Sequence, residues 1–370
     1  ASMIHNEMRK HGIKLVLGYT VEGFKEKDNG VEVLLKDNPS LQADMVVLAI
    51  GVTPDTVLAK EAGLEFGIKE SIVVNDRMET SVPDIYAAGD AVQVKHYVTG
   101  NDALISLAGP ANKQGRIIAD NICGGDSRYL GSQGSSVIKV FDMTAATTGI
   151  NETNAKKSGL EVDTVILSPM SHAGYYPGGK VMTMKVIFEK ESYRLLGAQI
   201  IGYEGVDKRI DVLATAIHAG LNATQLKDLD LAYAPPYSSA KDPVNMAGFM
   251  IDNIAKGTLK QWHLEDMDKI SKDKDVVLLD VRTVGEFSMG HIDGFKNIPV
   301  DELRERISEI EKGKPVYLIC QSGLRSYIAS RILEGNGYET YNFSGGFRFY
   351  DAVVNDRALI ERAYACGMDY

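Results

Sequence analysis

The stretch LICQSGLRSYIAS, residues 318–330, combines an apolar run, a cysteine and the expected start of a helix. The apolar run predicts a buried strand that ends at Cys320. After such a strand, successive backbone N–H groups can point toward the sulfur, and Gly323 allows the tight curve. Together with Arg325 they would stabilise a thiolate or persulfide anion, so both residues are candidate catalytic residues. The alternative is a structural cysteine buried at a strand end.

The sequence around this loop predicts a small parallel α/β domain. DKDVVLLDV, KPVYLICQ and YETYNF each predict a strand, with helices between them. Residues 257–370 form this predicted domain, and GTLKQWHL (257–264) is interpreted as its linker. Four charged residues upstream of the loop are expected to brace the domain rather than react: Asp280, Arg282, Glu286 and His291.

D-x-R-x-x-x-E-F-x-x-G-H-I-x-G, from Asp280 to Gly294, together with C-x-x-G-x-R-S, resembles the rhodanese family. The resemblance implies that Cys320 accepts and passes on sulfane sulfur. The loop from Cys320 to Arg325 has six residues, the rhodanese length, which favours sulfur transfer over the dephosphorylation of related phosphatases. The residues expected to hold the transferred group are Gln321, Ser322, Gly323, Leu324 and Arg325.

TSVPDIYAAGDA, residues 80–91, places a glycine and an aspartate at an expected strand end. Its pattern resembles the second flavin-binding motif of the pyridine nucleotide-disulfide oxidoreductases. The resemblance implies that Asp90 contacts the ribitol of FAD, with Tyr86, Gly89 and Ala91 beside it. AIGVTPDT (49–56) resembles the linking segment of the same family, which implies that Gly51 lies near the flavin and the nicotinamide of NADH or NADPH.

Residues 1–130 are interpreted as the C-terminal part of Rossmann-like FAD- and NAD(P)H-binding domains. A helix should end at Gly12, two strands should follow, DMVVLAIG (44–51) should be a buried strand, and residues 104–125 should contain a helix. No G-x-G-x-x-G occurs in the sequence, although this family carries two, and its redox cysteine is absent. We therefore expect the chain to be a fragment that binds FAD poorly and lacks reductase activity.

Residues 131–256 predict an α+β block. SSVIKVFDMTAATTGI (135–150) predicts a strand, Asn151 a helix cap, and residues 181–202 a hairpin that turns near Glu191. Two amphipathic helices are expected over residues 206–220 and 242–257.

SHAGYYPGGK and YAPPYSSAKDP resemble the dimerisation domain of coenzyme A-disulfide reductases. The resemblance implies a homodimer in which Tyr233 and Tyr175 reach into the partner's active site, although Tyr176 competes with Tyr175 for this role. It also implies that Lys113 and Lys241 contact the phosphates of coenzyme A. The alternatives are tyrosines that only pack at an interface and lysines that are simply solvated.

Composition excludes several classes of function. A net charge of −10 and a pI near 5.3 argue against nucleic-acid binding. Three widely spaced cysteines favour a reducing, cytoplasmic location and give no zinc-like spacing, so no metal site is expected. No apolar run is long enough to span a membrane.

The combined motifs predict a FAD-dependent NAD(P)H oxidoreductase that reduces CoA persulfide, polysulfide or CoA disulfide, with a rhodanese cysteine that carries sulfur. Coenzyme A would be a substrate. Two alternatives stay open: a sulfurtransferase on a dimer scaffold, and an NADH oxidase or peroxidase.

Overall fold

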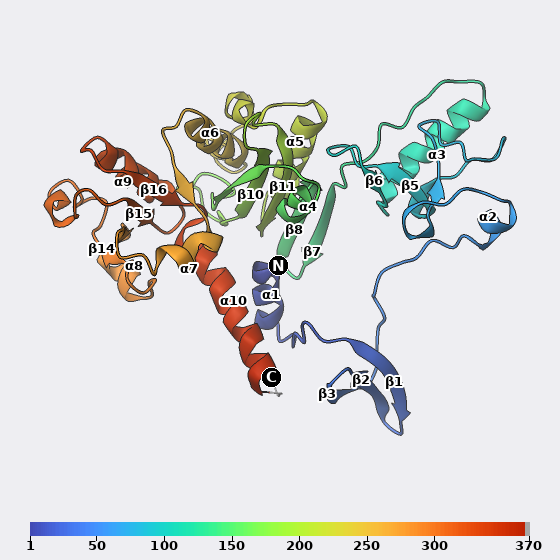
Figure 1. Ribbon diagram of the computed structural model, residues 1–370, viewed down its shortest axis with the longest axis horizontal. Helices are drawn as coiled ribbons and strands as arrows, with labels where there is room; N and C mark the ends of the chain where they lie inside the picture. Colours follow the sequence, from blue (N-terminus) through green and yellow to red (C-terminus); the bar gives the residue numbers. More distant parts are fainter. Residues whose placement is uncertain (367–370) are drawn as a thin grey trace. The chain divides into compact units, whose positions relative to one another are not determined.

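The computed structural model describes residues 1–366, and residues 362–366 are described only as backbone helix (Figure 1). The side chain of Cys366 therefore lies outside the described residues. The chain divides into two compact units: one holds residues 1–96, 100–132 and the chain from 352 onward, and the other holds residues 97–99 and 133–351. No helix in the described part of the chain is both long and apolar enough to cross a membrane.

The first unit begins with a helix and a small antiparallel sheet. α1 (Ser2–Lys10) ends before Gly12, as predicted. The sheet has the order β1-β2-β3. The first strand is predicted over IKLVLGYTVEGF (13–24), but β1 begins only at Val21. β3 is not predicted from the sequence because NPSLQA is mostly polar. The strands are β1 (Val21–Lys27), β2 (Gly30–Leu35) and β3 (Asn38–Ala43).

The apolar run DMVVLAIG, residues 44–51, is not the buried strand that the sequence predicts. No strand forms there. Met45, Val47, Leu48 and Ile50 are between 64% and 90% exposed. A buried parallel strand needs hydrogen-bonded neighbours, and no described strand pairs with these residues. The prediction is therefore wrong for this chain.

A second small sheet, β4-β5-β6, carries the turn that contains Gly89 and Asp90. β5 pairs with β4 in parallel and with β6 antiparallel. The residues just before Gly89 form only an isolated bridge between Tyr86 and Glu79, so the strand expected to end there is absent. The elements are α2 (Val57–Glu61), η1 (Ile68–Glu70), β4 (Ile72–Val73), η2 (Gly89–Ala91), β5 (Val92–Lys95), β6 (Asp102–Ala103) and α3 (Ala108–Ile122).

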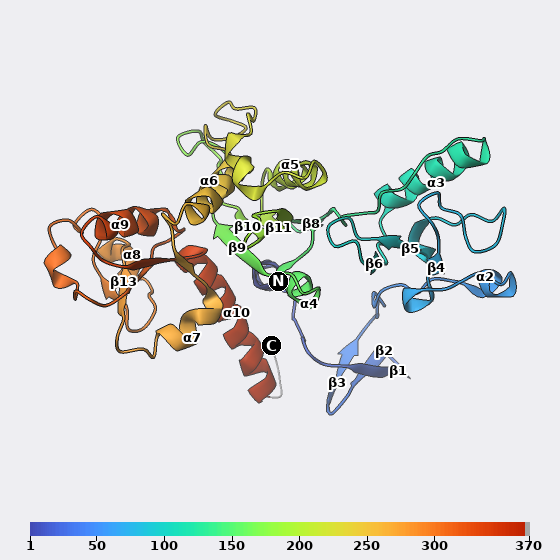
Figure 2. The same ribbon diagram turned by 45° about the horizontal axis from the view of Figure 1, so that its top comes forward.

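The second unit contains a five-stranded antiparallel sheet with the order β7-β8-β11-β10-β9. Helices α5 and α6 pack against this sheet (Figures 1 and 2). Apolar side chains from strands and helices form one buried core between them. The elements are β7 (Ser136–Val140), β8 (Met143–Gly149), α4 (Glu152–Lys157), β9 (Val162–Leu167), β10 (Thr183–Glu189), β11 (Leu195–Gly202), α5 (Val206–His218), η3 (Ala223–Asp228) and α6 (Pro243–Ala255).

Most local predictions in this sheet are confirmed, with one correction. The side chain of Asn151 accepts a hydrogen bond from the N–H of Asn154 and caps α4, and β10 and β11 form the predicted hairpin. Residues 135–150, however, form the two strands β7 and β8 instead of one. The chain reverses at Phe141, whose φ of 53° is left-handed.

The same unit contains a parallel sheet with the order β12-β16-β15-β13-β14. The interpretation of residues 257–264 as a linker is wrong, because β12 pairs with β16 and Trp262 is 2% exposed. The elements are β12 (Gln261–Trp262), η4 (Leu264–Asp266), α7 (Met267–Ile270), β13 (Val277–Asp280), α8 (Val284–Ser288), β14 (Lys296–Asn297), η5 (Ile307–Glu309), β15 (Val316–Ile319), α9 (Leu324–Glu334), β16 (Thr340–Phe343) and α10 (Gly346–Cys366).

Candidate functional site

Cys320 directly follows β15, the central strand of the parallel sheet, and is fully buried. Its Sγ accepts hydrogen bonds from the backbone N–H of Gly323 at 3.1 Å and from the hydroxyl of Ser326 at 3.2 Å. Gly323 precedes α9 and has a left-handed φ of 101°, which glycine adopts without strain. Two donors next to the N-terminus of a helix are suited to a thiolate or persulfide anion.

Ser326 is a functional candidate that the sequence analysis does not single out. Its buried hydroxyl lies within hydrogen-bond distance of both Cys320 Sγ and the carbonyl oxygen of Gly323, 3.1 Å away. A hydroxyl has one proton and donates to one acceptor at a time. Donation to sulfur suits the anion, whereas donation to the carbonyl suits the protonated thiol. The sequence signal was the serine that follows Arg325.

The SGG turn, residues 344–346, packs against the backbone of the cysteine loop (residues 320–325). The backbone N–H of Phe347 donates to the carbonyl oxygen of Cys320 at 2.8 Å. Gly346 has a φ of 68°, and a Cβ at this position would lie 2.7–2.8 Å from backbone atoms of the cysteine loop. The segment NFSGGFR, residues 342–348, therefore contains a position that only glycine fills without displacing the loop.

Arg325 forms a two-point ion pair with Glu286, with both N···O distances 2.7 Å. The carboxylate of Glu286 also accepts the N–H of Thr283 at 3.0 Å at the start of α8. The hydrogen bond from Arg325 is the main cause that lowers the pKa of Glu286 to about 2. The same hydrogen bond with Glu286 is the main cause that raises the pKa of Arg325. Arg325 therefore remains a fixed cation beside the cysteine loop.

The residues predicted to brace the domain make the expected structural contacts. Arg282 pairs with Asp280 at 2.7 Å, and both side chains are buried. The Arg282 guanidinium also lies 3.8 Å from the ring centroid of Phe347, next to the SGG turn. The Nδ1 atom of His291 lies 3.1 Å from the carbonyl oxygen of Phe287 on α8. These contacts hold the segments that surround the cysteine loop, namely the end of β13, α8 and the start of α10, in position.

The other loop residues differ in exposure. Gln321 and Ser322 are half-buried, and Leu324 is 66% exposed at the start of α9. Gln321 Oε1 lies 3.5 Å from an Nη atom of Arg282. Leu324 therefore gives the loop a solvent-facing apolar side chain, and the role of these residues in binding substrate stays a prediction.

The structure brings together the two tyrosines that the sequence singles out. The hydroxyls of Tyr175 and Tyr233 lie 2.8 Å apart, and both side chains are exposed. This hydrogen bond is the main cause that raises the pKa of Tyr233. Tyr176 instead makes an edge contact with the ring of His172, at 5.6 Å between centroids. Of the two neighbouring candidates, Tyr175 is the one that pairs with Tyr233.

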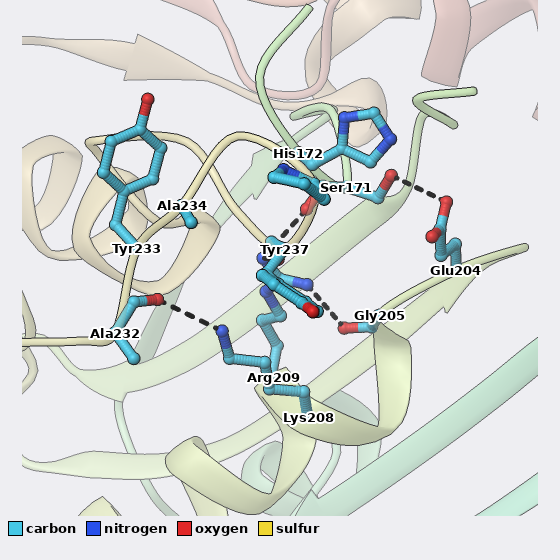
Figure 3. A pocket seen from close by; sticks show the side chains of 11 residues that line it. Ser171, His172, Glu204, Gly205, Lys208, Arg209, Ala232, Tyr233, Ala234 and Tyr237 are labelled. Carbon is cyan, nitrogen blue, oxygen red and sulfur yellow. Dashed lines mark hydrogen bonds between the residues drawn. The ribbon is translucent and has the colours of Figure 1, made fainter. Parts of the chain in front are cut away.

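A buried arginine on α5 connects both tyrosine-bearing segments. Arg209 is 1% exposed and donates to the carbonyl oxygens of Ser171 at 2.9 Å and Tyr237 at 3.4 Å (Figure 3). Its charge is balanced by Asp242, 3.0 Å away at the start of α6. A pocket of about 460 Å³ lies beside it, and Tyr233 is among the lining residues (Figure 3). The sequence gives no local sign of this role.

The turn at Gly89 and Asp90 has open hydrogen-bonding capacity. Gly89 has a φ of 85°, and its N–H donates to the buried side chain of Gln114 on α3 at 2.7 Å. The carboxylate of Asp90 is exposed, with no hydrogen bond to any described residue. These features fit an aspartate that accepts hydrogen bonds from the hydroxyls of a flavin ribitol. Half-buried Tyr86 and Ala91 flank the turn.

The remaining predicted site residues are on the surface. Lys113, next to Gln114 on α3, is exposed, and so is Gly51. Lys241 is exposed, with its Nζ 5.6 Å from the ring centroid of Phe249. Cys123, at the end of α3, is an exposed free cysteine. Both lysines are therefore accessible to an anionic ligand.

Three family models match successive parts of the chain. Residues 1–115 match the pyridine nucleotide-disulphide oxidoreductases, residues 135–243 match the dimerisation domain of the same family, and residues 263–352 match the rhodanese-like domain. The chain therefore belongs to the pyridine nucleotide-disulphide oxidoreductases and carries a C-terminal rhodanese-like domain. FAD and a nicotinamide coenzyme are the cofactors of this family.

Three similar proteins resemble the chain over most of its length. The crystal structure of reduced Bacillus anthracis CoADR-RHD is 46% identical, with a TM-score of 0.93 over 96% of this chain and 64% of that chain. A NAD-dependent persulfide reductase from A. fulgidus is 40% identical, with a TM-score of 0.86 over 95% of this chain and 64% of that chain. The NAD(P)H sulfur oxidoreductase (CoA-dependent) of Pyrococcus abyssi is 36% identical over 65% of this chain and 54% of its own length. The chain thus spans about half the length of this curated relative.

Proposed function

We propose that this chain is part of a FAD-dependent NAD(P)H oxidoreductase that reduces CoA persulfide, polysulfide or CoA disulfide, and that Cys320 carries sulfane sulfur. The observation that carries the proposal is the presence in one chain of a buried cysteine with two hydrogen-bond donors and of the paired phenols of Tyr175 and Tyr233. The names of the similar proteins, a persulfide reductase and a CoA-dependent sulfur oxidoreductase, support the same substrate class.

The cysteine loop accounts for the sulfur-transfer step. With thiosulfate as donor, the thiolate of Cys320 attacks the outer sulfur, the S–S bond of thiosulfate breaks, and sulfite leaves with the electron pair. The product is a Cys–S–S⁻ persulfide whose charge equals that of the starting thiolate. The N–H of Gly323, the hydroxyl of Ser326 and the cation of Arg325 stabilise this charge.

The tyrosine pair accounts for a proton-transfer step. Overall, NAD(P)H, one proton and CoA persulfide give NAD(P)⁺, coenzyme A and hydrogen sulfide. A thiolate that leaves a persulfide or disulfide needs a proton or a hydrogen bond, and a phenol can provide either. A phenol with an ordinary pKa near 10 is protonated at neutral pH, and the hydrogen bond with Tyr175 raises the pKa of Tyr233 further, so its proton is present for donation.

Cofactor and substrate would be held by residues with open hydrogen-bonding capacity. Asp90 would accept hydrogen bonds from the FAD ribitol, and the flavin would relay two electrons from the nicotinamide when bound. Lys113 and Lys241 would pair with the phosphates of coenzyme A. The reducing cytoplasm predicted from the cysteine content would keep Cys320 as a free thiol that can accept sulfane sulfur.

The direct test measures NADH oxidation by the whole protein with CoA persulfide and with oxygen. We expect faster oxidation with the persulfide, with one sulfide released per NADH. Faster formation of hydrogen peroxide would instead identify an oxidase. Sulfur transfer from thiosulfate to cyanide without any dependence on NADH would identify a plain sulfurtransferase.

Replacement of Tyr233 by phenylalanine should slow persulfide reduction in the whole protein by about tenfold, because a proton donor is lost while the neighbouring hydroxyl of Tyr175 remains. Flavin absorbance should not change. Tyr176→Phe is the matched control, because this phenol does not belong to the pair. Equal rates for Tyr233→Phe and the unaltered protein would leave Tyr233 with a packing role.

The chain should form a homodimer through residues 135–256, which contain the match to a dimerisation domain. Exposed apolar side chains on β7, Val137 at 54% and Ile138 at 56%, are available for such a contact. Light scattering at micromolar concentration should report twice the chain mass of 40.4 kDa. A folded monomer under these conditions would contradict the prediction.

A further inference from the structure

The dimerisation domain and the rhodanese-like domain meet at the free edge of β9, inside one compact unit. β9 pairs with β10 on one side only. Side chains from the rhodanese-like domain cover the other side: Gln261 donates to the carbonyl oxygen of Thr164 at 2.8 Å, and the N–H of Ile166 donates to Ser344 Oγ at 3.1 Å. On this edge, the carbonyl oxygen of Thr164 and the N–H of Ile166 thus form hydrogen bonds with side chains instead of with a neighbouring strand.

Asp163 adds a charged contact to the same junction. Its Oδ1 accepts a hydrogen bond from Gln261 at 3.1 Å and lies 3.0 Å from Nε2 of His263. Both partners belong to GTLKQWHL, residues 257–264, the segment whose sequence suggests a linker. The junction is therefore specific and polar, and it holds the rhodanese-like domain against the β9 edge of the dimerisation sheet.

The contact at Ser344 continues to the cysteine loop. Ser344 is 2% exposed and is the first residue of the SGG turn. Directly after the turn, the N–H of Phe347 donates to the carbonyl oxygen of Cys320 at 2.8 Å, and the N–H of Arg348 donates to that of Gln321 at 3.1 Å. A short stretch of chain thus joins the edge of the dimerisation domain to the backbone of the sulfur carrier.

We propose that the dimerisation domain positions the cysteine loop through Ser344, so that the reactivity of Cys320 depends on how the two domains dock. The hydrogen bond from the N–H of Ile166 to Ser344 holds the SGG turn in position. The residues after the turn hydrogen-bond to the backbone of the cysteine loop, and this backbone orients the N–H of Gly323 toward the sulfur. Ser344 does not touch the sulfur, so it is a positioning residue. The inference rests on the proposed role of Cys320 as a sulfur carrier.

The test compares variants of the 370-residue chain in thiosulfate loading, with the added sulfur on Cys320 measured by mass spectrometry. Ser344→Ala should lower the maximal loading rate by about fivefold, the equivalent of one hydrogen bond, with little change in the half-saturating thiosulfate concentration. The matched control is Ser288→Ala, because this exposed hydroxyl bonds only within α8.

A second variant lies outside the rhodanese-like domain. Asp163→Ala should also slow loading, and the double variant should be no slower than the slower single variant, because both act through one junction. If Ser344→Ala does not fold, as judged by circular dichroism, the loading rate of Asp163→Ala alone tests the inference. Unchanged loading in Asp163→Ala, or in a folded Ser344→Ala, would overturn the inference while leaving the sulfur-carrier role intact.

One further result would contradict the proposed function of Cys320 itself. If the unaltered chain takes up no sulfur from thiosulfate, Cys320 is not a carrier, and the inference fails with it. Alkylation of Cys320 by iodoacetamide gives a readout that does not depend on sulfur transfer, and it should slow in both junction variants but not in Ser288→Ala.

Discussion

Replacement of Cys320 by serine should abolish sulfur loading from thiosulfate, because a hydroxyl cannot replace the thiolate as the sulfur acceptor. Mass spectrometry of the peptide that contains residues 315–325 should show one added sulfur in the unaltered chain and none in the variant. Cys123 is an internal control, since it is an exposed thiol outside the cysteine loop. It should acquire little sulfur under the same conditions.

Arg325→Ala should retain loading at a rate about tenfold lower, because one of the groups that stabilise the persulfide charge is lost. The variant also leaves the carboxylate of Glu286 without its arginine partner. Glu286→Gln separates the two effects, since it keeps Arg325 in place and removes the paired charge. Equal labelling of Cys123 and Cys320 in the unaltered chain would show that the loop does not activate its cysteine.

Replacement of Arg209 by methionine should reduce the free energy of unfolding of the dimerisation domain by about 3–5 kcal/mol. Asp242 would be left as a buried charge without its cation, and the carbonyl oxygens of Ser171 and Tyr237 would lose a donor. Calorimetry should show a melting temperature lower by about 10 °C. Hydrogen exchange should become faster in the segments that carry Tyr175 and Tyr233.

The matched control is Arg306→Met. Arg209 pairs with one buried carboxylate, whereas Arg306 pairs with two, Glu302 and Glu309, on the surface, so its loss should cost less than about 1 kcal/mol. A similar small effect for Arg209→Met would mean that water or neighbouring groups compensate the buried carboxylate. Arg209 would then not be the residue that holds the tyrosine segments.

The sequence is most informative where function depends on a short continuous segment. The Cys320 loop and the Asn151 cap are each built from residues a few positions apart, and the structure contains both. The bracing role of Asp280 and Arg282 is predictable for the same reason, because these residues are two positions apart. Tyr175 and Tyr233 are singled out only through family resemblance, and the hydrogen bond between their hydroxyls is not predicted from the sequence, because they are 58 positions apart.

The domain junction cannot be predicted from local patterns. His263 and Asp163 are 100 positions apart, and GTLKQWHL has the polar composition of a linker. The buried role of Arg209 is equally difficult to predict from the sequence, because an arginine in an amphipathic helix usually lies on the solvated face. The folded chain shows that Arg209 is buried and that Asp242 balances its charge.

The exposed run MVVLAI, residues 45–50, has a consequence for the behaviour of the chain in concentrated solution. It contains six consecutive apolar residues without charge, proline or glycine. Segments of this composition stack in register as cross-β strands when several copies meet. A net charge of −10 repels whole molecules from one another, but it does not protect an uncovered strand-forming segment at close range. Aggregation of the isolated chain would therefore start at these residues and not at the folded rhodanese-like domain.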